Sequence, residues 1–316
     1  MKHILFIDPL EKLNYKKDSS LMLATTMKKA GVEVYLLFEK DFYVANRGEL
    51  KYQVYSFSSE FDEAGFYLKK FQLVEAVEVK LAKDDCLHMR IDPPFDTRYL
   101  KYLWMLRHLQ NLGIQVLNSP DGILKYNEKL HAYAQKSALP SFVGSSKSQF
   151  LEFVNSLSET NDFIMKPLDL FQGFGVEKVS KQTQNILEVF ERKIQEHQGA
   201  IVVQPFNPKV ESGEIRSIFF KAEELGSILK VPKKGEFLAN IAQGASFHAI
   251  ELTNELQKEC KAICTDLMKD GVDWVAFDIM GDSVSEINIT CPGLLVEVSF
   301  AHKKNLAEIL LQSINR

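Results

Sequence analysis

The sequence is poor in cysteine, and its four cysteines form no CxxC pair and no zinc-like spacing with histidine: Cys86, Cys260, Cys264 and Cys291. This pattern argues against a structural zinc module. Cys260 and Cys264 stand one helical turn apart, where two thiols usually act as small core hydrophobes. We therefore expect reduced cysteines and a cytoplasmic location.

Long apolar runs are also absent. No stretch approaches the roughly 18 uninterrupted apolar residues of a membrane span, and the apolar run near Met1 lacks the long core and cleavage site of a signal peptide. The net charge is −4 and no basic stripe is concentrated anywhere, so a nucleic-acid backbone is not the expected partner. We expect neither membrane nor nucleic-acid binding.

The first part of the chain predicts an α/β unit with parallel strands. His3 to Ile7 is expected to form a buried strand, followed by a helix from Leu21 that Asp18 caps and Gly31 stops, and then by a strand from Val32 to Phe38. Further predicted elements are a strand over 86–91, a helix over 97–112 and a strand over 114–117. We place the end of this domain at residue 121.

The second part, 122–316, predicts a mixture of helices and antiparallel strands. Expected strands cover 163–167, 200–205, 216–220 and 225–231, and expected helices begin at 127 and cover 252–270. We divide this region into a subdomain over 122–204 and another over 205–316, with a mobile loop over about 231–246.

The most informative stretch runs from Asp278 to Asn288, where two apolar runs flank a Gly-Asp turn. Alternation along a strand places Glu286 and Asn288 on one face, and Asp278 can join them from the neighbouring strand. Three hard oxygen ligands on one face suit Mg²⁺ carrying ATP phosphates. A hairpin with a polar outer face explains the same spacing equally well.

Two lysines precede this set. Lys129 begins a helix, and Lys166 ends an apolar strand, where a charged group needs a partner such as phosphate. Gly173 lies in a short loop whose backbone N–H groups could face phosphate oxygens. The alternatives are solvated lysines and a plain hairpin.

A possible adenine-binding hinge follows at Gln204, Pro205, Phe206 and Asn207, where a strand leaving its sheet would offer free backbone groups. Arg216 begins a later strand, and its guanidinium suits the negative charge of an acyl phosphate or tetrahedral intermediate. A Pro-bounded turn and a surface salt bridge are the alternatives.

The order of these features resembles the ATP-grasp superfamily of carboxylate–amine ligases, and the chain resembles a bacterial glutathione synthetase nearly from end to end. The stretches that carry the resemblance are Lys16-Lys17-Asp18-Ser19-Ser20, Met89 to Thr97 (Met-Arg-Ile-Asp-Pro-Pro-Phe-Asp-Thr), Leu117-Asn118-Ser119-Pro120, Asn127-Glu128-Lys129-Leu130, Met165-Lys166-Pro167-Leu168-Asp169 and Asp278 to Thr290.

The resemblance implies a fold class and a reaction. The fold would be mixed α/β, with an N-terminal parallel α/β domain followed by an ATP-grasp fold of two α+β subdomains that clasp ATP. ATP would phosphorylate the cysteinyl carboxylate of γ-glutamylcysteine, and the amine of glycine would then attack the acyl phosphate. The implied cofactors are ATP and two Mg²⁺ ions, with Mn²⁺ as a substitute, and the implied assembly is a homodimer or homotetramer.

The resemblance also implies a role for each matching residue. Lys129, Lys166, Gly173 and Gln204 to Asn207 would bind ATP, and Asp278, Glu286 and Asn288 would carry the metal ions. Arg216, Lys166 and Asn288 would act in catalysis. The residues expected to contact the substrates are Ser19, Arg90, Asp92, Asp96, Lys230 and Asn240.

Three segments depart from the family pattern. The small loop is usually close to Gly-Met-Gly-Gly and here is Leu170 to Phe174; the mobile loop usually has Arg-Gly-Asn and here has Leu238-Ala239-Asn240; and the usual Ser-Pro-Thr is Cys291-Pro292-Gly293. These departures leave two alternatives beside an active glutathione synthetase. One is a ligase with another carboxylate or amine, and the other is a nucleotide-binding protein that has lost catalysis.

Overall fold

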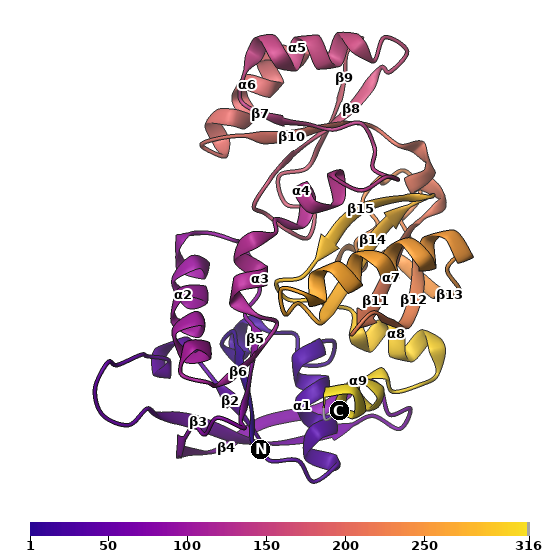
Figure 1. The fold of residues 1–316 in the computed structure, drawn as a ribbon. Helices are drawn as coiled ribbons and strands as arrows, with labels where there is room; N and C mark the ends of the chain where they lie inside the picture. The colour runs from indigo at the N-terminus through magenta and orange to yellow at the C-terminus, as the bar shows by residue number, and fades with distance from the viewer. Residues whose placement is uncertain (315–316) are drawn as a thin grey trace.

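The computed structural model describes residues 1–314. In this range the strands form three sheets that follow one another along the sequence. Figure 1 shows the first sheet at the bottom, the third in the middle and the second at the top. The third sheet therefore lies between the other two, and the candidate site residues gather around it.

The first sheet has the strand order β4-β3-β2-β1-β5-β6. Its parallel strands are β1 (His3–Ile7), β2 (Val34–Leu37), β5 (Cys86–Arg90) and β6 (Gln115–Leu117). Helices α1 (Ser19–Lys29) and α2 (Thr97–Asn111) begin at side-chain caps from Asp18 and Asp96. These elements confirm the predicted parallel α/β unit. A long antiparallel hairpin of β3 (Lys51–Phe61) and β4 (Leu68–Lys80) extends the sheet and was not predicted.

The second sheet is antiparallel, in the order β7-β10-β8-β9. Its strands are β7 (Phe142–Gly144), β8 (Asp162–Pro167), β9 (Glu177–Ser180) and β10 (Ile201–Pro205). Helices α5 (Lys147–Ser156) and α6 (Ile186–Glu196) pack on it, and the stacked rings of Phe150 and Phe190, with centroids 4.0 Å apart, join the two helices.

The third sheet is also antiparallel, in the order β13-β12-β11-β14-β15. Its strands are β11 (Glu214–Phe220), β12 (Glu223–Val231), β13 (Ser246–Ile250), β14 (Trp274–Met280) and β15 (Ser283–Asn288). Helix α7 (Asn254–Met268) packs on one face, and its Cys260 and Cys264 lie in that core, as predicted from their spacing. Between β12 and β13, residues 232–245 form a loop with a short 3₁₀ turn, Ile241–Gln243.

The other face of the third sheet joins the first domain. The last two helices, α8 (Leu295–His302) and α9 (Leu306–Ile314), share one core with α1 and with Ile218, Ile228 and Trp274 of the third sheet. Figure 1 shows α9 returning beside α1, close to the N-terminal sheet. The end of the described chain thus completes the core of its beginning.

Asn118 also links the first domain to the third sheet through hydrogen bonds. Its side-chain nitrogen donates to the carbonyls of Trp274 (2.7 Å) and Ile289 (2.9 Å), and its oxygen accepts from the N–H groups of Asp273 (3.0 Å) and Trp274 (2.8 Å). The short helices α3 (Pro120–Lys125) and α4 (Glu128–Tyr133) then lead to the second sheet. No helix within residues 1–314 combines the length and apolar character needed to cross a bilayer.

Candidate active site

The structure brings together the three predicted metal ligands at the β14–β15 pair. Asp278 lies directly opposite Glu286 in the antiparallel register, and Asn288 lies opposite Ala276 on the same strand pair. The side-chain nitrogen of Asn288 donates to Asp278 Oδ2 at 3.0 Å and to the carbonyl of Ala276 at 3.1 Å. The nitrogen is therefore used within the protein, and the amide oxygen is the atom that a cation would meet.

The Asp278 carboxylate is already surrounded by donors. Arg216 binds it through both Nε (3.0 Å) and a terminal nitrogen (2.7 Å), and Lys230 Nζ donates to Oδ1 at 2.8 Å. Burial by itself would raise the pKa of Asp278, but the charges of Arg216 and Lys230 outweigh burial and hold the pKa well below its usual range. Asp278 is ionised and internally neutralised.

Glu286 is held more loosely, between the two predicted phosphate-binding lysines. Lys166 Nζ lies 3.4 Å and Lys129 Nζ 3.8 Å from Glu286 Oε1, and the glutamate side chain is 24% exposed. Burial works to raise the pKa of Glu286, and the two lysine charges lower it below its ordinary value. The lysines thus converge on one carboxylate although they come from α4 and β8.

Glu214 belongs to the same charge cluster and was missed by the sequence interpretation. It accepts a hydrogen bond from Lys230 Nζ at 2.6 Å, so Lys230 bridges Glu214 and Asp278. Its spacing two residues before Arg216, on the same strand face, was the available signal. The cluster contains four cationic side chains (Lys129, Lys166, Arg216, Lys230) against three carboxylates (Glu214, Asp278, Glu286), which favours an anionic ligand.

The candidate oxygen ligands suit Mg²⁺, provided that Asp278 gives up one of its hydrogen bonds. Glu286 and the Asn288 oxygen offer hard acceptor atoms of the kind that Mg²⁺ prefers. A carboxylate has about four lone-pair sites, and four N–H donors already occupy Asp278. Asp278 can therefore join a metal only by exchanging a hydrogen bond to Arg216, Lys230 or Asn288.

A second missed residue, Glu128, anchors the helix that carries Lys129. One carboxylate oxygen of Glu128 accepts from the backbone N–H of Ile289 (2.7 Å) and of Thr290 (2.9 Å) and from the Thr290 hydroxyl (2.8 Å). Burial raises the pKa of this carboxyl. Its position between the Asn127 cap and Lys129 was the only sequence signal.

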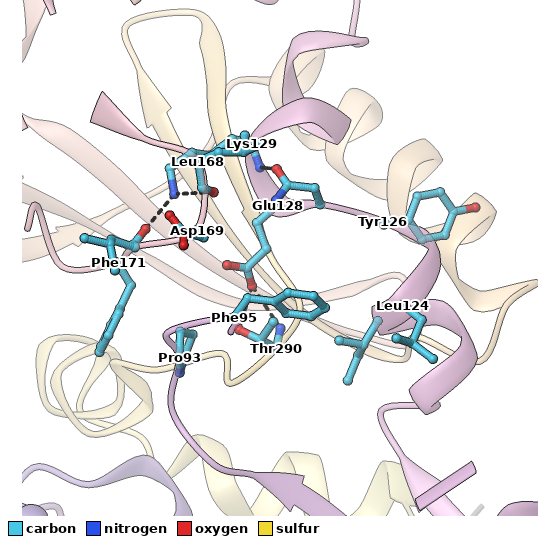
Figure 2. Close-up of a pocket in the computed structure, with 13 residues that line it drawn as sticks. Pro93, Phe95, Leu124, Tyr126, Glu128, Lys129, Leu168, Asp169, Phe171 and Thr290 are labelled. Carbon is cyan, nitrogen blue, oxygen red and sulfur yellow. Dashed lines mark hydrogen bonds between the residues drawn. The ribbon is translucent and has the colours of Figure 1, made fainter. Parts of the chain in front are cut away.

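A pocket of about 70 Å³ lies beside this anchor, between the loop at Pro93, the connection at Leu124 and the loop over 168–171. Figure 2 shows Glu128 pointing toward Thr290 near Phe95, while Lys129 points to the loop at Leu168. Lys129 Nζ donates to the carbonyl of Leu170 at 2.7 Å. A hydrogen bond thus links Lys129 directly to the small loop.

The two loops that depart from the family pattern contact each other. Asn240 donates from its side chain to the carbonyl of Gln172 at 2.9 Å. Gly173 has a φ of +79°, and a Cβ at this position would meet the Leu238 side chain at 3.2 Å. Loop 232–245 therefore covers the small loop in this structure, and Gly173 lies at its closest approach.

Two polar groups of the predicted hinge are hydrogen-bonded within the protein. The backbone N–H of Phe206 donates to the carbonyl of Asp162 at 2.8 Å, and the Gln204 side chain donates to the Ser141 hydroxyl at 2.8 Å. The Phe206 N–H is therefore used within the protein, because β10 stays hydrogen-bonded to β8 one residue beyond Pro205. The Phe206 ring packs edge-on against Phe237 of loop 232–245.

The predicted substrate residues of the first domain all make contacts within the protein. Arg90 donates to Ser20 Oγ (2.9 Å) and to the Pro292 carbonyl (2.8 Å), and its guanidinium lies over the Trp274 ring. Ser19 Oγ accepts from the N–H of Leu295 at 3.0 Å, and Asp96 caps α2. Burial raises the pKa of Asp92, against the opposing effects of Cys291 and Arg90. These residues lie where the first domain meets the third sheet.

Comparison with known families identifies the family to which this chain belongs. Residues 1–123 match the family described as the N-terminal domain of prokaryotic glutathione synthetase, and residues 128–303 match its ATP-grasp domain. The chain belongs to the prokaryotic glutathione synthetase family. This confirms the resemblance seen in the sequence.

Curated relatives named glutathione synthetase match along the whole chain. The protein of Prochlorococcus marinus is 28% identical over 314 residues, which cover 99% of both chains. The protein of Parasynechococcus marenigrum is 29% identical over 318 residues, covering 100% of this chain and 98% of its own. The chain is thus an enzyme of the ATP-grasp ligase type, and it uses ATP and small-molecule substrates.

Solved structures confirm the mixed α/β ATP-grasp fold. The D-cycloserine synthetase DcsG has a TM-score of 0.68 at 13% identity and covers 98% of this chain, with 99% of its own chain covered. The ATP-grasp ligase PsnB, complexed with a minimal precursor, has a TM-score of 0.62 at 15% identity, with 99% of each chain covered. At such identities the likeness concerns the fold alone.

Proposed function

We propose that this member of the prokaryotic glutathione synthetase family joins γ-glutamylcysteine to glycine. The carboxylate of the dipeptide attacks the γ-phosphorus of ATP, and ADP leaves. The glycine amine then attacks the acyl carbon, phosphate leaves, and the amine loses a proton. The observation that supports this most is the buried cluster of four cations and three carboxylates at the β14–β15 pair.

The cluster suits this chemistry because phosphoryl transfer depends on positioning and on charge stabilisation more than on a protein nucleophile. Lys129 and Lys166 would bind phosphate oxygens when these replace Glu286 as their partner. Arg216 would bind the oxygen that gains charge at the acyl centre. Bound Mg²⁺ would supply further charge neutralisation, held by Glu286, Asn288 and Asp278.

The direct test is product formation by the purified protein. With ATP, Mg²⁺, γ-glutamylcysteine and glycine, ADP and phosphate should appear in proportion to glutathione. Asp278→Asn and Glu286→Gln should abolish this turnover, while Asp282→Asn should leave it unchanged, because Asp282 lies in the exposed hairpin turn beside them. ATP turnover that does not require glycine would contradict the proposal.

One observation favours a second candidate, a ligase with a different acceptor amine. Leu238 stands where the family usually has arginine, and its side chain lies next to Gly173 of the small loop. A panel of amines assayed for ADP release would decide between the two, and efficient use of glycine alone would exclude the second.

We also propose that the first domain ends at residue 121 and that the boundary between the two subdomains lies between residues 204 and 205. We propose that the protein acts in the cytoplasm.

We further propose that the protein assembles as a homodimer or homotetramer. Light scattering of the purified protein would test this assembly.

A further inference from the structure

A cluster of three metal-ligating side chains lies outside the active site, within the first sheet. His3 on β1 and Cys86 and His88 on β5 have ligand atoms that all lie within 4.8 Å of one another. His3 is paired with Cys86 in the parallel register, and alternation places His88 on the same face. Both histidines are fully buried and Cys86 is 5% exposed.

The two histidines do not satisfy each other. His3 Nδ1 lies 2.9 Å from His88 Nε2, so one ring donates and the other accepts. The remaining nitrogens, His3 Nε2 and His88 Nδ1, have no hydrogen-bond partner among residues 1–314. An unsatisfied buried polar group costs about 1 to 3 kcal/mol, which makes this an unusual core arrangement.

We propose that His3, Cys86 and His88 form a binding site for a soft monovalent metal ion, Cu(I). Neutral imidazole and thiolate are the ligands that such ions prefer. Metal–ligand bonds of about 2.0 to 2.3 Å place ligand atoms roughly 3.3 to 3.8 Å apart. The two imidazole nitrogens, 2.9 Å apart, would separate by roughly half an ångström, and Cys86 Sγ, which lies within 4.8 Å of the histidine ligand atoms, would close on the same ion.

The summed charge of the ligands and the ion favours a monovalent ion. Binding releases the Cys86 thiol proton, and the His3–His88 hydrogen bond is replaced by metal bonds from His3 Nδ1 and His88 Nε2, while His3 Nε2 and His88 Nδ1 each keep one proton and stay without a hydrogen-bond partner. One thiolate, one Cu(I) and two neutral imidazoles sum to zero. Zn²⁺ usually requires a fourth ligand, and the cluster offers three.

The test is an anaerobic titration of the purified full-length protein with Cu(I), in competition with a chromogenic Cu(I) chelator, and a parallel titration with Zn²⁺. Wild type and Cys260→Ala, which removes a thiol buried on α7, should each bind one Cu(I). Cys86→Ser and His88→Asn should lose this binding while keeping the circular dichroism of the folded protein. Copper X-ray absorption should show one sulfur and two nitrogen ligands.

Thermal unfolding gives a second readout that does not depend on activity. Cu(I) should raise the unfolding midpoint of wild type and of Cys260→Ala but not of Cys86→Ser, since an ion that binds only the folded state stabilises it. Failure of wild type to bind Cu(I), or equal binding by Cys86→Ser, would overturn the site. Tighter binding of Zn²⁺ than of Cu(I) would overturn the choice of ion.

Discussion

At the scale of single residues, buried and exposed ion pairs of this protein should respond very differently to substitution. Lys230 is 6% exposed and bridges Glu214 and Asp278, whereas Lys209 is 60% exposed and pairs with Asp282 in a surface turn. Removing one partner of a buried pair leaves an uncompensated charge, but exposed pairs contribute little.

We predict that Lys230→Met lowers the free energy of unfolding by about 3 to 5 kcal/mol. The matched change Lys209→Met should cost less than about 1 kcal/mol. Urea unfolding of the two variants would measure the difference. Equal stabilities would show that Glu214 finds another partner when Lys230 is removed.

A second residue-scale prediction concerns pH. Burial raises the pKa of Asp18 to about 6, with the nearby Asp92 adding to the rise and the Leu21 N–H and Arg90 opposing it. The folded state then binds the proton more tightly than the unfolded state, so stability falls as pH rises from about 4 to 6 and stays lower above that range.

Asp18→Asn keeps a cap for α1 and removes this titration. We expect the variant to lose a pH-dependent contribution of up to roughly 3 kcal/mol between pH 4 and 6. Denaturant unfolding of both proteins across that range tests it. Parallel stability–pH curves for wild type and variant would contradict the assignment.

Most of the charged residues that gather at the site were proposed from the sequence, but their partners were not. Spacing on β15 placed Glu286 and Asn288 together, because a strand alternates with a fixed period. It could not show that Lys230 and Arg216 would both bind Asp278, since that depends on the register of β11, β12 and β14. Glu128 and Glu214 were missed for the same reason.

At the scale of elements, the Glu128 carboxylate joins helix α4 to the residues just beyond β15. Glu128 binds two backbone N–H groups and a hydroxyl just beyond β15, and Lys129 follows it on the same helix. Loss of the carboxylate would release the helix from the strand and leave those N–H groups unpaired.

We predict that Glu128→Ala weakens ATP binding roughly tenfold, a change of about 1.4 kcal/mol. Glu128→Gln keeps an acceptor oxygen and should weaken it less. Calorimetric titration with a non-hydrolysable ATP analogue would show this order. The exposed substitution Glu255→Ala, in the first turn of α7, serves as the control, and an unchanged affinity in Glu128→Ala would refute the anchoring role.

The elements themselves were predictable to different degrees. Caps and apolar runs predicted α1, α2 and the parallel strands because their signals are local. The β3–β4 hairpin was not predicted, although apolar residues alternate with polar ones along both strands, at Tyr52 and Val54 in β3 and at Val77 and Val79 in β4. Most of β4 is nevertheless exposed. Sequence also does not show where a strand stops pairing, so the hydrogen bond from the Phe206 N–H to Asp162 could not be foreseen.

At the scale of the whole molecule, the last helix belongs to the core of the first domain. Leu306, Ala307 and Leu310 of α9 are buried with Leu23, Ala24 and Met27 of α1. The C-terminal helices are part of the ATP-grasp half by sequence order, yet they complete the other half.

We predict that Leu310→Ala lowers the free energy of unfolding by about 2 to 5 kcal/mol, since it opens a cavity in this shared core. Hydrogen exchange should speed up in α1 as well as in α9. Leu112→Ala, at a largely exposed leucine, should leave exchange in both helices unchanged. Protection in α1 that survives Leu310→Ala would show that the first domain is stable without α9.

Because α9 packs against α1, the core of the first domain stays incomplete during synthesis until α9 is made. Helix α1 ends at Lys29 and α9 begins at Leu306, so the ribosome makes α1 long before α9, and the first domain emerges with one flank of its core uncovered. Until α9 has been made, the apolar surface of α1 stays exposed or is covered by a chaperone. The nascent chain can form its parallel strands early, but it can bury α1 fully only once α9 has left the ribosome.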